Sequence, residues 1–164
     1  NPKLNLQTIN EFLDKDSLNT LIPTVDYVIN TIDFECHAFI DCHFLCKKYN
    51  KTELFPVNLG FGGGIIINDN TTQNWNDYFG TKSIKELKLK LIEIFIKDNN
   101  FSPQMLLKFD EYCKNPPEND PQTCASVLIC SNLLLTSLIA LVSKQNVKKF
   151  PKTIAFDPLS ITLS

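Results

Sequence analysis

The chain has 164 residues, of which 43% are hydrophobic and 21% charged, so it is long enough to enclose a core and too apolar for intrinsic disorder. The formal net charge is −2 and all 16 basic residues are lysines, so the arginines that usually contact phosphate and guanine are missing. We therefore expect a single domain over residues 1–164 that binds no nucleic acid and carries no polybasic membrane signal.

Two helices are expected in the N-terminal part of the chain. Residues 6–14 form a short amphipathic segment. From Leu18 to Ile40, apolar residues then recur every three or four positions. This series predicts a helix over 17–49, with Pro23 either kinking it or marking its true first turn.

Residues 50–82 are expected to form a long loop rich in glycine and asparagine. The helical period stops there, and Pro56 and Gly60 mark turns. The run 65–67 (Ile-Ile-Ile) is either a short buried strand or a loop segment on the core.

Three further helices are predicted in the C-terminal half. Ser83 with Glu86 gives a capping-box pattern that opens a helix over 83–98, and a proline in the first turn opens a helix over 102–114. After a rigid turn at 115–119 comes a helix over 121–143, and the tail 150–164 is expected to be extended.

The helix predicted over 121–143 contains no charged residue. A run this apolar is typical either of a membrane span or of a central helix surrounded by others. We favour the central helix, with Leu134 and Leu138 in the core. The resulting fold prediction is all-α: a disulfide-stabilised bundle of about five helices.

The six cysteines are expected to form three disulfides, because the number is even and no zinc-finger spacing is present. Three lie on the N-terminal helix and three near the C-terminal helix pair, so the bridges should cross between the groups, which leaves six of the fifteen possible connectivities. If the two helices are antiparallel, the favoured pairs are Cys36–Cys130, Cys42–Cys124 and Cys46–Cys113.

Disulfides indicate an oxidising compartment, so we expect a secreted, extracellular protein whose signal peptide has been removed. Three N-glycosylation sequons, at Asn50, Asn70 and Asn100, lie where loops or helix ends are expected and suit a glycoprotein.

The sequence contains no convincing catalytic, cofactor or metal site. Residues 36–46 hold three cysteines with His37 and His43, but one helix cannot supply the paired short loops of a zinc finger. A cysteine nucleophile would need an unpaired thiol beside a base. The glycines of 60–64 lack the Lys-Ser/Thr of a phosphate-binding loop. Carboxylate pairs such as Asp110-Glu111 are expected on helix surfaces.

The spacing Cys42-x-x-x-Cys46 in a helical six-cysteine chain resembles the insect odorant-binding family of secreted carriers. The remaining cysteines depart from that family's spacings, so no ligand residue is carried over. The abundance of Asn, Lys and Ile is similar to that of secreted proteins of insects and parasites, including aphid salivary effectors.

Three functional hypotheses follow, in order. The first is a non-catalytic effector or interaction protein that binds a host or partner protein. The second is a carrier of a small hydrophobic ligand in a cavity between helices, and the third is a hydrolytic enzyme. We expect neither a cofactor nor association with a membrane. An exposed apolar patch would favour the first hypothesis, and an apolar pocket the second.

Overall fold

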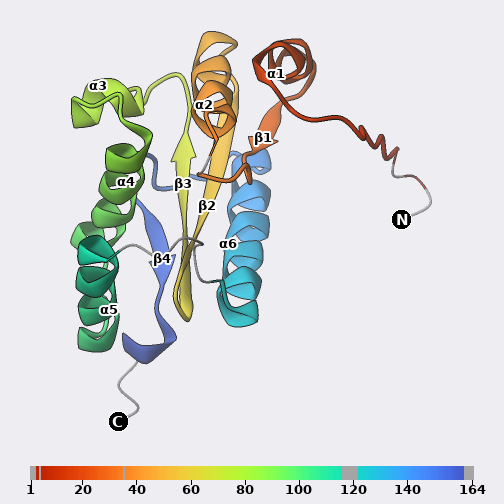
Figure 1. The fold of residues 1–164 in the computed structure, drawn as a ribbon. Coiled ribbons are helices and arrows are strands. Elements are labelled where there is room, and N and C mark those ends of the chain that lie inside the picture. Colours follow the sequence, from red (N-terminus) through yellow and green to blue (C-terminus); the bar gives the residue numbers. More distant parts are fainter. Residues whose placement is uncertain (1–2, 4, 35, 116–121, 161–164) are drawn as a thin grey trace.

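The structure is a computed structural model that describes residues 3, 5–34, 36–115 and 122–160. It contains both helices and strands (Figure 1). They are α1 (Lys15–Leu21), β1 (Tyr27–Ile29), α2 (Ala38–Lys48), β2 (Thr52–Leu59), β3 (Gly62–Asn68), α3 (Trp75–Phe79), α4 (Ile84–Asp98), α5 (Pro103–Lys114), α6 (Cys124–Val142) and β4 (Ile154–Phe156), with 3-10 turns at Ile22–Thr24 and Pro158–Ser160. Most of the predicted turn at 115–119 and the last four residues of the tail, 161–164, lie outside the described residues.

The predicted all-α fold is wrong, because a four-stranded sheet lies at the centre of the molecule. The strand order is β1-β2-β3-β4, with β1 parallel to β2 and the other neighbours antiparallel. The central pair, β2 and β3, is a hairpin in register from Glu53–Asn68 to Leu59–Gly62. Its turn contains Gly60 at φ +61°, a left-handed conformation that glycine adopts without strain.

The hairpin occupies the segment predicted as a loop. Its glycines lie within β3 because helices approach that strand closely from both faces. A Cβ atom on Gly63 would lie 2.7 Å from Cys130 Sγ of α6, and one on Gly64 would lie 2.7 Å from Phe95 Cδ1 of α4. The run 65–67 is a fully buried part of the same strand.

The helix predicted over 17–49 is also wrong. α1 ends at Leu21, Pro23 lies in the following 3-10 turn, and β1 pairs with the start of β2 before α2 begins at Ala38. Pro23 has no N–H to continue a helix, and the aromatic and β-branched residues of β1 suit a strand. The helix predicted over 6–14 does not form either. Asp14 instead caps α1 by accepting a hydrogen bond from Ser17 N at 2.9 Å.

The starts of α4 and α5 match their sequence signals. The Ser83 side chain accepts from Glu86 N at the start of α4, although the Glu86 carboxylate accepts from Thr81 and does not complete the predicted capping box. Ser102 precedes Pro103 at the start of α5. α6 begins three residues later than predicted, because Thr123 forms its capping box with Ser126.

The sheet separates two sets of helices (Figure 1). α4 covers one face and builds the larger core with α2 and with Phe55, Val57 and Ile66 of the hairpin. α6 covers the other face, where Leu54, Ile65 and Ile67 pack against its leucines. A smaller cluster joins α1 to α2.

α6 is not the buried central helix that its composition predicted. Only 17% of its most apolar 18-residue stretch is buried, and by length and composition it could cross a membrane. Its inner face packs on the hairpin through small side chains, Ser126, Cys130 and Ser137, which are buried. Leu134 and Leu138 are only partly buried beside them.

The predicted disulfides are not formed, since all six cysteines are free thiols and no pair lies at disulfide distance. The prediction required α2 and α6 to be antiparallel neighbours. α2 instead packs on α1 and on the α4 side of the sheet, whereas α6 packs on the opposite face. The three predicted pairs, Cys36–Cys130, Cys42–Cys124 and Cys46–Cys113, therefore join elements that are not neighbours.

Candidate ligand-binding groove

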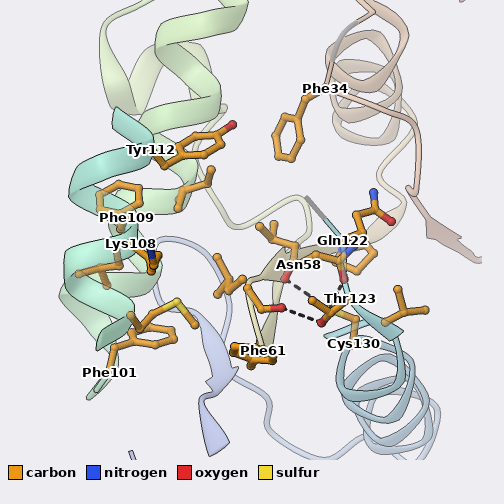
Figure 2. A pocket seen from close by; sticks show the side chains of 18 of the residues that line it. Phe34, Asn58, Phe61, Phe101, Lys108, Phe109, Tyr112, Gln122, Thr123 and Cys130 are labelled. Atoms are coloured by element: carbon orange, nitrogen blue, oxygen red, sulfur yellow. Dashed lines mark hydrogen bonds between the residues drawn. The ribbon is translucent and has the colours of Figure 1, made fainter. Parts of the chain in front are cut away.

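An apolar groove of about 1180 Å³ lies between α5 and α6 (Figure 2). The two helices form its sides, and strand β2 with the hairpin turn forms its floor. The segment between β1 and α2 closes one end with Phe34. Since these elements are far apart in sequence, only the folded chain creates this site.

The floor of the groove is an uncovered sheet edge. β1 pairs with only the first three residues of β2, up to Leu54. Pro56 and Asn58 pair with β3 on one side, and no strand among the described residues lies on their other side. Asn30 N donates to Leu54 O at 3.0 Å, and by the alternation of backbone groups Pro56 faces the same edge. Proline at an open edge has no N–H to leave unpaired, which disfavours pairing with another strand.

Aromatic side chains line the walls. Phe109 and Tyr112 come from α5, Phe34 from the loop before α2, and Phe61 from the hairpin turn (Figure 2). Phe34 is held in place by an edge-on contact with Phe55, at 5.3 Å between ring centroids. The side chain of Met105, the single methionine of the chain, completes the α5 wall.

α5 is attached loosely for a helix of its length. None of its twelve residues is buried, and Leu107 is 66% exposed. A wall with so little buried surface costs little free energy to move.

Several polar groups of the groove are paired within the protein. Cys130 Sγ lies 3.3 Å from Val57 O and 3.4 Å from Asn58 Oδ1, and Thr123 Oγ1 donates to Gly60 O at 2.8 Å. Lys108 at the rim forms an ion pair with Glu111 at 2.8 Å. Burial raises the pKa of the Cys130 thiol, so it is a poor nucleophile at neutral pH. No histidine is among the residues that line the groove.

His43 lies in a second polar cluster, which is fully buried. Its Nδ1 lies 2.7 Å from Glu53 Oε2, and the Glu53 carboxylate also accepts from Asn30 at 2.7 Å and Asn68 at 3.1 Å. Trp75 stacks on the His43 ring with 3.9 Å between the ring centroids, and its indole N–H donates to Asn68.

The hydrogen bonds fix the tautomer of His43. Trp75 N donates to Nε2 at 3.4 Å, so Nε2 is the acceptor. Nδ1 therefore carries the hydrogen and donates a hydrogen bond to Glu53. Both side chains are 0% exposed, so neither reaches a substrate. The cluster joins β1, α2, β2, β3 and α3 and is structural. An acidic residue in an otherwise apolar strand, Glu53, was the sequence signal for it.

The remaining candidates from the sequence are dispersed. Cys42 and Cys46 are buried in the α1–α2 cluster, where the hydrogen bond between them, burial and the nearby Glu53 raise the pKa of Cys46. His37 is exposed at the start of α2. Among the described residues no three His, Cys, Asp or Glu side chains are placed to hold a metal ion. The sequon asparagines are accessible, and they are Asn50, Asn70 and Asn100.

No family model, no curated protein and no solved structure matches this chain. The function is therefore argued from the geometry alone.

The sequence analysis missed the groove. Its aromatic residues come from four separate segments, and Phe61 and Phe109 belong to no shared periodic pattern. One available signal was the helical spacing of Met105, Phe109 and Tyr112, which line the groove from α5.

Proposed function

We propose that the protein is a non-catalytic carrier that holds a small, elongated hydrophobic ligand in the groove between α5 and α6. The observation that carries this proposal is the groove itself, a concave apolar site of about 1180 Å³ with aromatic walls. Ligand sites of about 300–1,000 Å³ hold drug-sized molecules, so this one has room for a hydrocarbon chain.

The chemistry of the lining selects the class of ligand. Because the Cys130 thiol and the Thr123 hydroxyl hydrogen-bond to the protein, a ligand gains little by offering polar groups to these two side chains. An apolar ligand loses nothing there and removes the aromatic walls from water. A ligand of about 20 non-hydrogen atoms at about 0.3 kcal/mol each gains about 6 kcal/mol, a Kd of tens of micromolar.

This proposal places the carrier hypothesis ahead of the effector hypothesis. A concave, multi-element site is more specific support than an exposed apolar helix face. The expectation of secretion rested mainly on disulfides, and it loses that support because the cysteines are free. For a hydrolytic enzyme, neither the groove nor the buried His43–Glu53 pair supplies an accessible nucleophile with a base.

The test is a titration with N-phenyl-1-naphthylamine, an uncharged dye that fluoresces in apolar sites. We expect saturable binding in the micromolar range. The informative variant is Ser131→Trp, because Ser131 is an exposed α6 residue that lines the groove, so an indole there should occupy it.

Asn132→Trp is the matched control. Asn132 is the next residue of α6 and is equally exposed, but it does not line the groove. Ser131→Trp should weaken dye binding at least tenfold and Asn132→Trp should leave it unchanged. Equal affinities in the two variants, or no saturable binding to the unsubstituted protein, would contradict the proposal.

A further inference from the structure

The outward face of α6 is apolar and uncharged along its whole length. Its most exposed apolar side chains recur at the helical period and are Val127, Leu128, Leu135, Ile139 and Val142. They are 43% or more exposed, whereas a surface helix normally turns charged residues outward. α6 departs from this pattern because it is apolar on both sides: Leu134 and Leu138 pack inward on the hairpin, while the side chains named above point outward.

Two polar side chains on this face make hydrogen bonds within the helix. Ser131 Oγ donates to Val127 O at 2.8 Å, and Asn132 Nδ2 donates to Leu128 O at 2.9 Å. Serine commonly bonds this way where a helix meets a medium that offers no partners. The face can therefore be covered by hydrocarbon without stranding these two donors.

The inward face holds α6 against the domain. Cys130 contacts the hairpin floor, and Thr123 at the N-cap bonds to Gly60 O in the hairpin turn. While these contacts persist, the helix lies along the sheet and cannot cross a bilayer. It presents one side only, as interfacial helices do.

The charge next to this face suits an anionic surface. Residues 122–156 contain four lysines and no acidic residue. Lys144 and Lys148, both exposed, follow the C-terminal end of α6. Lys149 and Lys152 bind Asp69 and Asp98 of the domain itself.

We propose that α6 docks the protein on the surface of a bilayer containing anionic phospholipid, with its outward side chains at the boundary of headgroups and acyl chains. A protein interface normally carries a polar rim and groups that hydrogen-bond across to the partner. On the outward face of α6, Ser131 and Asn132 instead donate within their own helix. Hydrocarbon requires neither a polar rim nor such groups.

The docked orientation also bears on the groove, although the inference does not depend on the ligand proposal. Val127 and Ser131 belong both to the outward face and to the groove lining. A bilayer against α6 would therefore lie beside the mouth of the groove. Ligand could then pass between membrane and groove without crossing much water.

The test is co-sedimentation with vesicles of phosphatidylcholine, alone or mixed with phosphatidylglycerol. We expect the protein to pellet with the mixed vesicles and to be released by high salt and by alkaline carbonate. The triple variant Leu128→Asn, Leu135→Asn, Ile139→Asn should lower the partition coefficient at least tenfold. These three residues do not line the groove, so dye binding should persist.

Leu107→Asn is the matched control, because Leu107 on α5 is as exposed as Leu128 on α6, at 66% and 63%. It should bind vesicles like the unsubstituted protein. Lys144→Gln and Lys148→Gln should each reduce binding to the mixed vesicles about fivefold and leave binding to neutral vesicles unchanged. Circular dichroism should show that every variant remains folded.

Three results would overturn the inference. The first is a protein that stays in the supernatant with both kinds of vesicle. The second is a pelleted protein that resists carbonate, which indicates a membrane span. The third is an unsubstituted protein that forms a dimer and does not bind vesicles, when the triple variant is monomeric. That result would assign the outward face of α6 to contact with a second copy of the chain. Loss of dye binding in Ser131→Trp with vesicle binding intact would support the groove proposal independently.

Discussion

Alanine at position 63 would place a methyl group between β3 and α6, at the closest approach of helix and sheet. The added Cβ would lie 2.7 Å from Cys130 Sγ, 3.1 Å from Ile129 Cγ2 and 3.1 Å from Ser126 O. Two of these atoms belong to a buried side chain and to the helix backbone, so α6 must shift to make room. Overpacking of this kind costs about 1–3 kcal/mol, and replacing glycine recovers about 0.4–1 kcal/mol through the unfolded chain.

We therefore expect Gly63→Ala to lower the free energy of unfolding by about 1–2 kcal/mol. Urea titration followed by Trp75 emission measures this directly, because Trp75 is the single tryptophan, is 0% exposed and stacks on His43. Cys130→Ala should relieve the shortest contact, so the double variant should lose less stability than the sum of the two single losses. Strict additivity, or an unchanged Gly63→Ala protein, would refute the close packing of α6 on β3.

Three other outcomes follow from the same structure. In unreduced, denatured protein six thiols should react with Ellman's reagent, and in native protein the exposed Cys113 and Cys124 should react first. Fewer than six reactive thiols after denaturation would indicate a disulfide. Glu53→Gln should lower the free energy of unfolding by about 1–3 kcal/mol, because an amide nitrogen cannot accept from the donors that surround the carboxylate. An unchanged midpoint of urea unfolding would show that this buried network does not stabilise the fold. Although burial opposes it, hydrogen bonds from Lys152 and Thr153 N hold the pKa of Asp98 below its ordinary 3.8, so the stability that they add is present above pH 3.8 and is lost as the pH falls further. Asp98→Asn should therefore reduce the loss of stability below pH 3.8. The same acid dependence in the variant would show that Asp98 does not contribute to it.

The parts of the fold that local chemistry determines were predictable from the sequence. Ser83 and Ser102 cap α4 and α5 at the predicted places, because a cap depends on a few neighbouring residues. The sheet was not predictable in this way. Pro56 and three successive glycines in the hairpin look like turn signals, and their role depends on an open edge and on two helices distant in sequence.

The burial of α6 could not be predicted because the pattern is ambiguous. A helix that is apolar on every side looks the same in sequence whether protein, lipid or ligand covers it. The small residues Ser126, Cys130 and Ser137 recur at spacings of four and seven and do mark the inner face, but only against a partner strand of glycines. The helix over 17–49 was predicted wrongly for another reason. The apolar residues of this range keep a helical spacing, although they belong in turn to a helix, a strand and a second helix.

The most direct test of the carrier proposal uses the single methionine. Met105 lines the groove, so a protein labelled with ¹³C on its methionine methyl group, with any initiator methionine removed, gives one signal at the site. A spin-labelled fatty acid, the probe we would add, broadens signals of nearby nuclei. We expect it to broaden the Met105 methyl signal in the unsubstituted protein and in Asn132→Trp, and to leave it sharp in Ser131→Trp. A signal that stays sharp in all three proteins at saturating probe would show that the groove does not hold an apolar ligand.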